Sequence, residues 1–203
     1  MDIISRVVHW HEPPVIIPSE TISVQKIPFS DVVQTEYGMT TEEEATIYVC
    51  DKPSSVPVHP AGPYLSNTLT LMVEAQEKLM PRSLIPCHRI DRVTSGLTLC
   101  CTNVKVARLV QGRIEEGAVQ KLYLAKVHGK FPSSNQEAIT KLAMANSAEI
   151  AKWSWCEGES SIGLDAPIET VDPANGIRKI TEKGKPAQSL LKLVAFDESS
   201  IPH

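Results

Sequence analysis

No stretch of this 203-residue sequence approaches the roughly 18 consecutive apolar residues of a membrane-spanning helix, because charge, proline or serine interrupts every apolar run. The first residues, MDIISRVVHWHEPPV, also lack the basic-then-apolar plan of a secretory signal peptide. These two absences predict a globular protein without a membrane partner. We expect it inside the cell, in the cytoplasm, the nucleus or a mitochondrion.

Paired cysteine motifs are missing as well. The number of cysteines is odd and none forms a CxxC pair, which argues against a disulfide framework and against a zinc ribbon. A zinc-deaminase site is excluded because no second cysteine follows Cys87 at the required spacing and no HxE triplet occurs. We therefore expect no metal and interpret most of the thiols as small buried groups in a reducing compartment. They are Cys50, Cys87, Cys100, Cys101 and Cys156.

A net positive charge is also absent, since the chain carries a formal charge of −4 and has a pI near 5.9. Taken alone, this balance disfavours a nucleic-acid partner. The distribution changes that interpretation, because residues 78–130 hold ten basic and three acidic side chains and therefore carry +7, against −11 for the remainder. This basic segment suits phosphate contacts. The alternative is that these side chains are ordinary solvated faces of helices and strands.

The sequence contains no internal repeats and no low-complexity linker, which predicts one catalytic or binding domain over residues 46–203 after an extended arm at 1–45. We expect strands at 46–50, 96–102, 119–129 and 184–196, from β-type or alternating patterns. Helices are expected over 66–80 and from Asn103, as N-cap, to Glu116, with Gly117 ending the second. Residues 133–163 are compatible with a helix or with two weak strands. The proline-spaced segment at 51–62 should be a rigid loop, in which His59 is more typical of a packing residue than of a catalyst. This order predicts an α/β or α+β fold.

The most informative motif is HRIDRVTSGLTL, residues 88–99, which places Asp91 between Arg89 and Arg92 ahead of an apolar run. An aspartate paired with its flanking arginines on a loop would be the ordinary structural explanation of this pattern. However, the stretch closely resembles the catalytic signature of the RluA family of pseudouridine synthases, an HR-hydrophobic-D-x-x-TSG-L pattern. The segments DKPSSVPVHP, KLYLAKVHGKF, DAPI and GKPAQS resemble further motifs of that family in the same order. HEPPV and PVHPAGPYLSNTL resemble its eukaryotic, tRNA-modifying branch.

This resemblance implies a pseudouridine synthase fold, with a mixed, mainly antiparallel sheet flanked by helices, and an enzyme that isomerises uridine in structured RNA. Asp91 would be the catalytic carboxylate, acting as a nucleophile or on a reactive sugar intermediate. Tyr123, in the position of the family's tyrosine, would stack on the flipped uridine and could accept a proton, although it could also be an ordinary strand tyrosine. Arg89 and Arg92 would bind the RNA or keep Asp91 ionised.

Thr94, Ser95 and Gly96 would form a tight turn, with Gly96 allowing close packing. No cofactor is implied, and the partner is RNA, tRNA rather than ribosomal RNA.

The sequence departs from the family pattern at its end. Family members continue into a GR-T/S-HQ-type segment whose arginine partners the catalytic aspartate, and that segment does not occur here. We therefore expect the catalytic domain to lack its C-terminal part, and an N-terminal part as well. Three hypotheses follow: a pseudouridine synthase, a non-catalytic RNA-binding relative, or a truncated product that does not fold stably. The oligomeric state is not indicated.

Overall fold

In the computed structural model the chain divides into two compact units, Met1–Leu122 and Tyr123–His203. The structure describes residues 12–16, 21–34, 40–143, 151–156, 161–173 and 176–196. All strand pairs among these residues are antiparallel, and helices accompany the sheets. The fold class is therefore α+β, as predicted. No helix in the described part of the chain is long and apolar enough to cross a membrane.

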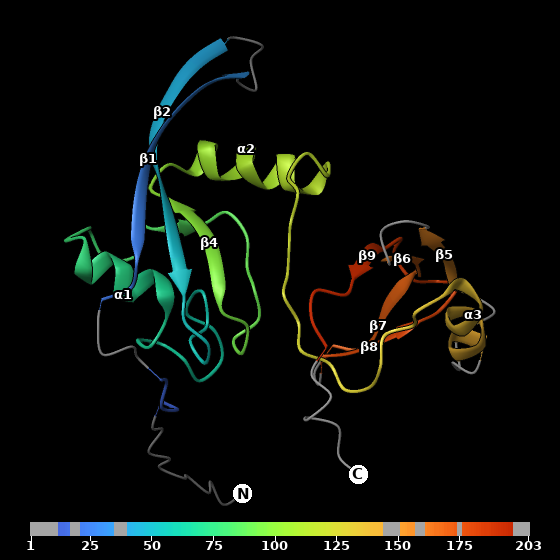
Figure 1. Cartoon of the computed structure of the whole chain (residues 1–203). Helices are drawn as coiled ribbons and strands as arrows, with labels where there is room; N and C mark the ends of the chain where they lie inside the picture. Colours follow the sequence, from blue (N-terminus) through green and yellow to red (C-terminus); the bar gives the residue numbers. More distant parts are fainter. Residues whose placement is uncertain are drawn as a thin grey trace, which may run out of the picture. The chain divides into compact units, whose positions relative to one another are not determined.

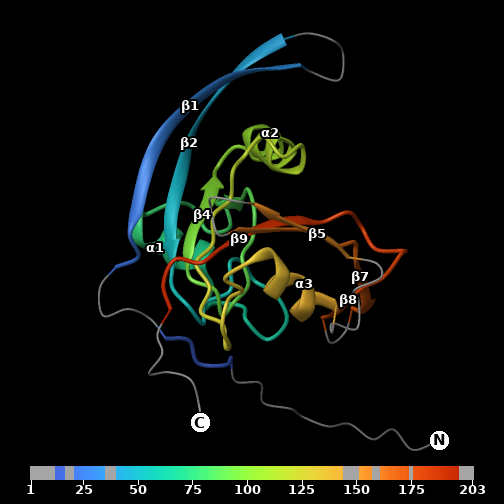
Figure 2. The ribbon, with the colours of Figure 1, turned by 45° about the vertical axis from the view of Figure 1, so that its right-hand side comes forward.

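The first unit is built on a four-stranded sheet in the order β1-β2-β4-β3 (Figure 1). Its two longest strands form a ribbon that extends beyond β4, because β4 pairs only with the last part of β2 (Figure 2). The strands are β1 (Val24–Gln34), β2 (Thr40–Lys52), β3 (Ile85–Pro86) and β4 (Gly96–Cys101).

Alternation along β2 and β4 gives this sheet two apolar faces. Tyr48 and Cys100 belong to one buried cluster, which includes Leu69 and Val73 of helix α1 (Leu69–Gln76). Ile47 and Cys101, one residue away on each strand, belong to a second cluster with Val106 and Ala107 of helix α2 (Val104–Glu115). Since successive side chains of a strand point to opposite faces, α1 and α2 cover opposite sides of the sheet.

Both helices end in Schellman motifs. In α2, Gly117 adopts a positive φ of 75°, its N–H donates to Ile114, and the next N–H donates to Arg113. The predicted N-cap is also confirmed, because the Asn103 side chain accepts from the N–H groups of Lys105 and Val106. Helix α1 is shorter than predicted at both ends.

The early stop of α1 has a local cause. Lys78 takes the left-handed conformation, with φ at 54°, and closes the same motif that glycine closes in α2. The buried carboxylate of Glu74 then accepts from the backbone N–H groups of Arg82 (2.8 Å) and Leu84 (2.7 Å). The helix therefore ends at Gln76 rather than at residue 80 as predicted, and these contacts turn the following chain back toward β3.

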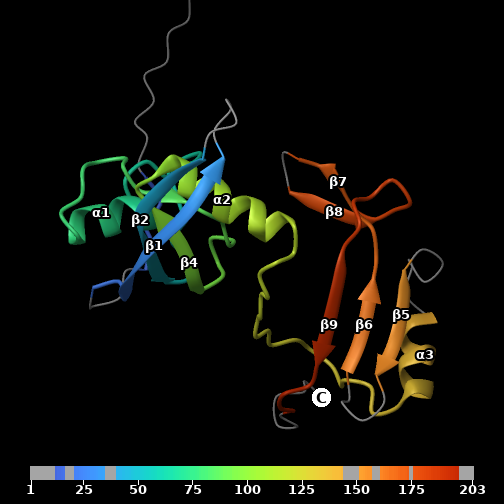
Figure 3. The same cartoon turned by 90° about the horizontal axis from the view of Figure 1, so that it is seen from above.

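The second unit contains a three-stranded sheet, β5-β6-β9, and a two-stranded sheet, β7-β8 (Figure 3). Helix α3 lies beside β5, and Glu137 accepts from Ser133 at its first turn while donating its own N–H to Ser134. Residues 133–163 therefore contain both a helix and strands. The elements are α3 (Asn135–Ala143), β5 (Lys152–Cys156), β6 (Ser161–Asp165), β7 (Ile168–Asp172), β8 (Ile177–Ile180) and β9 (Gln188–Lys192).

The predicted strand at residues 119–129 is wrong. This segment is irregular, and its apolar side chains Leu122, Leu124 and Val127 are 94%, 88% and 75% exposed. Alternation predicts a strand only where a neighbouring strand takes up its backbone hydrogen bonds, and none of the strands that the structure describes pairs with this segment. The predicted strand at 184–196 is confirmed at its centre by β9, and those at 46–50 and 96–102 by β2 and β4. The division between arm and domain at residue 45 stays a prediction, and β2 runs across it.

Candidate functional site

Asp91 lies in the loop between β3 and β4, together with both flanking arginines. Asp91, Arg89 and Arg92 are all exposed, and the Thr94 N–H donates to the Asp91 carbonyl over 3.0 Å, which closes a turn directly after the carboxylate. Within the described residues, no ion pair joins Asp91 to either arginine. The paired-aspartate interpretation of this motif is therefore not what the structure contains.

The buried side chain of Lys52 holds this loop through a hydrogen bond to its backbone. Lys52, at the end of β2, has no exposed surface, and its ammonium group donates to the carbonyls of Pro53 (3.0 Å), Val56 (2.7 Å) and Arg92 (3.1 Å). One side chain thus ties the proline-spaced loop to the loop that carries Asp91. Ser54 adds a second tie, because its hydroxyl donates to the Val93 carbonyl over 2.8 Å.

Lys52 also gives the site an unusual electrostatic feature. Burial lowers the pKa of its ammonium group, and the positive charge of Arg92 lowers it further. Asp91 acts in the opposite direction and raises the pKa of Lys52. The carboxylate of Asp91 is thus electrostatically coupled to a buried cation that the sequence analysis did not identify. The sequence feature that could have identified Lys52 is its position two residues after the buried Cys50, because this spacing places both side chains on the same inward face of β2.

Gly96 is required at the start of β4 for its backbone conformation. Its φ of 127° lies in a region that side-chain-bearing residues rarely adopt, and nothing lies within 4 Å of the position a Cβ atom would take. The expectation that Gly96 allows close packing is therefore wrong, and the turn geometry is the physical reason for glycine.

The arginines have separate surroundings. The Arg92 guanidinium lies 5.8 Å from the centre of the Tyr64 ring, within cation–π range. The segment after Tyr64 is fixed by Glu12, whose carboxylate accepts from the backbone N–H groups of Leu65 and Ser66 at 3.0–3.1 Å and also from that of Asn67. Glu12 therefore meets the PYLSN stretch, which follows it by more than 50 residues in the sequence, close to the tyrosine that Arg92 contacts.

A cavity of about 460 Å³ lies on the other side of the motif, at Arg89. The cavity borders the last turns of α2, and Gln111 of this helix donates to the Pro86 carbonyl over 3.2 Å. His88 is half-buried there, and its Nε2 accepts from the Leu99 N–H over 3.1 Å. Burial, followed by the charge of Lys121, lowers the pKa of His88. The lining residues are His59, Pro86, Cys87, His88, Arg89, Gln111, Ile114 and Glu115.

Tyr123 is the one predicted site residue that lies outside this unit. It is the first residue of the second unit and is exposed in the irregular segment described above. Its role stays a prediction.

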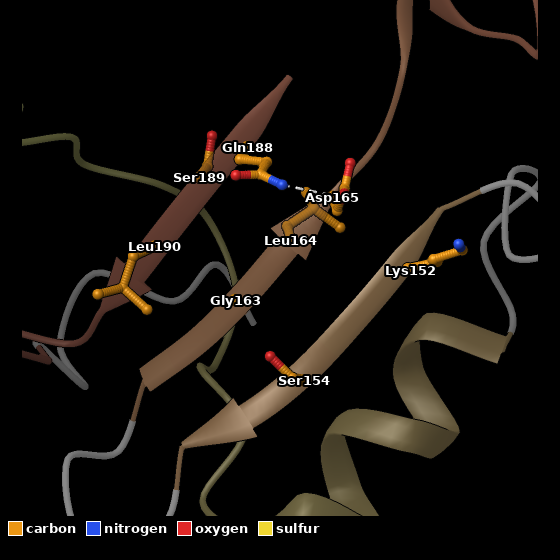
Figure 4. A pocket seen from close by; sticks show the side chains of 8 residues that line it. All are labelled: Lys152, Ser154, Gly163, Leu164, Asp165, Gln188, Ser189 and Leu190. Carbon is orange, nitrogen blue, oxygen red and sulfur yellow. Dashed lines mark hydrogen bonds between the residues drawn. The ribbon is translucent and has the colours of Figure 1, made fainter. Parts of the chain in front are cut away.

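The second unit has a hollow of its own, of about 450 Å³, against the sheet β5-β6-β9 (Figure 4). Gln188 donates to Asp165 across neighbouring strands over 3.1 Å, so this carboxylate already has a partner. Gly163 has no side chain to fill this hollow, and a Cβ atom at this position would lie 2.7 Å from the Ser154 hydroxyl oxygen. No group of three or more potential metal ligands occurs among the residues that the structure describes.

The arrangement at Asp91 combines an exposed carboxylate, a loop backbone held by side-chain hydrogen bonds, and several cations. Such a carboxylate can attack or stabilise an electron-poor sugar carbon, and exposed arginines can hold phosphate groups. The structure brings together three of the four predicted site residues in one loop, and it adds Lys52 beneath them.

Comparison with known proteins gives a consistent result. Residues 46–200 match a family described as RNA pseudouridylate synthase. The tRNA pseudouridine(31) synthase of Saccharomyces cerevisiae is 34% identical over 174 residues, 85% of this chain and 39% of that protein. The mitochondrial tRNA pseudouridine(32) synthase of the same yeast is 30% identical over 200 residues, 97% of this chain and 33% of that protein. RNA pseudouridine synthase 7 of Oryza sativa subsp. japonica is 38% identical over 133 residues, 66% of this chain and 29% of that protein. The chain thus spans less than two fifths of each relative.

Proposed function

Because this chain belongs to the RNA pseudouridylate synthase family, of the RluA type, we propose that it carries the catalytic carboxylate of an enzyme that isomerises uridine to pseudouridine in tRNA. The observation that carries the proposal is Asp91, exposed in a loop that Lys52 and Ser54 tie to its neighbour. Rigid support of this kind is what a reacting group needs, since small misplacements are costly to catalysis. The printed names of the two yeast relatives support tRNA as the substrate.

The proposed reaction moves the base within one nucleotide. The bond between C1′ of the ribose and N1 of uracil breaks, the base turns, a bond forms between C1′ and C5, and the C5 proton is lost while N1 gains one. Atoms and electrons balance without an external donor. The carboxylate of Asp91 would stabilise or capture the electron-poor C1′ carbon.

The remaining predicted residues have RNA-binding roles in this proposal. Arg89 and Arg92 are exposed beside Asp91 and can contact the RNA backbone. Tyr123 would stack on the flipped uridine and could take the C5 proton.

Replacement of Asp91 by asparagine tests the proposal. We expect the parent chain to form pseudouridine in a tRNA pool, and Asp91→Asn to slow this by roughly a hundredfold or more, because the amide cannot supply the negative charge. Pseudouridine mapping at nucleotide resolution provides the measurement. Asp51→Asn, at an exposed aspartate at the end of β2, is the matched control and should leave the rate unchanged.

Two outcomes would contradict the proposal. Full activity of Asp91→Asn would remove the carboxylate from the chemistry. Tight tRNA binding without conversion by the parent would instead identify the chain as a non-catalytic RNA-binding member of the family.

A further inference from the structure

The cavity at Arg89 is not needed for the chemistry at Asp91, yet polar groups of both hydrogen-bonding kinds surround it. Its volume of about 460 Å³ falls within the roughly 300–1,000 Å³ of small-ligand sites. Pro86 and Ile114 supply apolar surface, whereas Arg89 and Glu115 supply a fork of donors and a pair of acceptor oxygens. An apolar wall with a few polar groups is typical of a pocket for a flat, hydrogen-bonding molecule.

His88 adds a defined donor to this set. Its Nε2 accepts from the Leu99 N–H, so the neutral ring carries its proton on Nδ1. Burial lowers the pKa of His88, which keeps the ring neutral at physiological pH. His88, which lines the cavity, therefore carries an N–H donor on Nδ1 without adding a positive charge.

This donor and acceptor pattern distinguishes among the nucleobases. A carboxylate accepts best from two adjacent donors, and guanine alone has them, at N1–H and the N2 amine. The O6 and N7 atoms of guanine are acceptors that suit the guanidinium of Arg89 and the Nδ1–H of His88. Adenine, cytosine and uracil would each place an acceptor against Glu115.

We propose that this cavity binds an unpaired guanine base of the substrate RNA, on a nucleotide close to the uridine that Asp91 modifies. Arg89 and Asp91 are two positions apart in the sequence, with Ile90 between them, which limits the distance between their Cα atoms to about 7 Å. Recognition of splayed-out bases by their edges is the usual route to sequence specificity in single-stranded RNA. The inference rests on the proposed function and gives it a sequence preference.

Short RNA oligonucleotides with one central uridine test the proposal, each with guanosine at one flanking position replaced by adenosine or by inosine. Inosine lacks only the N2 amine, so it removes one of the two donors offered to Glu115. At one flanking position, guanosine should raise kcat/KM for pseudouridine formation by about ten- to a hundredfold over adenosine, with inosine in between. The Kd of Asp91→Asn, whose slowed turnover allows binding to be measured by itself, should be lowest with guanosine, higher with inosine and highest with adenosine.

Glu115→Gln should abolish the difference between guanosine and inosine, because the amide presents one acceptor and one donor. Glu116→Gln is the matched control: it makes the same change at the C-cap residue directly after α2, on an exposed side chain outside the cavity, and should keep the preference. Far-ultraviolet circular dichroism of both variants checks that α2 is intact.

The outcomes separate this inference from the proposed function. Uridine conversion without a flanking-guanosine preference, or with a guanosine-over-inosine preference that survives Glu115→Gln, would overturn the inference and leave the synthase standing. A Glu115-dependent guanosine preference in Kd without any conversion would support the cavity and overturn the synthase. An absence of RNA binding would overturn both.

Discussion

Lys52 is the residue on which the geometry around Asp91 depends. Its ammonium group satisfies three backbone carbonyls, so its replacement leaves buried acceptors without a donor. We expect Lys52→Met, which keeps the length of the side chain, to lower the free energy of unfolding by about 1–3 kcal/mol. Urea denaturation followed by circular dichroism gives this value.

The same substitution should affect catalysis beyond stability. Loss of the contact to the Arg92 carbonyl loosens the backbone beside Asp91, so kcat should fall more than KM rises. Lys183→Met, at an exposed position in the second unit, is the control. Unchanged stability in Lys52→Met would mean that the carbonyls find water instead, and an unchanged kcat would show that the loop keeps its geometry without the tie.

At the scale of an element, Glu12 connects the N-terminal part of the chain to the segment that leads into α1. Hydrogen bonds from three consecutive backbone N–H groups, led by that of Asn67, lower the pKa of Glu12 in spite of an opposing desolvation effect. A carboxyl group with a lowered pKa in the folded state stabilises that state above its unfolded pKa, near 4.5, and loses this contribution as pH falls through the folded value.

We therefore expect the melting temperature of the protein to fall more steeply below about pH 4.5 than that of Glu12→Gln. Thermal melts of both proteins between neutral and acid pH measure the difference. Glu116→Gln, at an exposed glutamate of the first unit without such backbone contacts, should follow the parent curve. Parallel curves for the parent and Glu12→Gln would show that the charge of Glu12 does not hold the segment.

The elements also show where sequence patterns suffice and where they fail. Both ends of α2 could be predicted from Asn103 and Gly117, because helix caps are local hydrogen-bonding motifs. The end of α1 was missed because Lys78 takes the place usually held by glycine, and a buried Glu74 turns the chain. The alternating pattern at 119–129 predicts a strand that does not form, because pairing depends on a partner that no local pattern specifies.

The same distinction applies to the candidate site. The spacing in HRIDR was enough to single out Asp91 and its arginines. Lys52 and the cavity at Glu115 were missed, because each depends on segments that meet only after folding: the end of β2 with the Asp91 loop, and α2 with the segment after β3.

At the scale of the whole molecule, the two units differ in how much they bury. The first has two clusters of buried side chains on opposite faces of its sheet. In the second, the described buried apolar residues are Ala138, Ile162 and Ala166, and all five residues of the edge strand β9 are exposed. Local stability follows buried apolar contacts, so the units should open with different free energies.

Hydrogen exchange of the 203-residue chain, followed by mass spectrometry, should resolve this difference. We expect peptides from β4 to exchange more slowly than those from β9, by a factor of about 100 or more, because β4 is flanked by strands on both sides and covered by helices on both faces. Among the described strands β9 pairs only with β6, and neither cluster of the first unit contains a residue of β9, so β9 can open without disrupting them. Equal protection of the two strands would show that the chain unfolds as one cooperative body, and that the segments around β9 are stabilised by more than its pairing with β6.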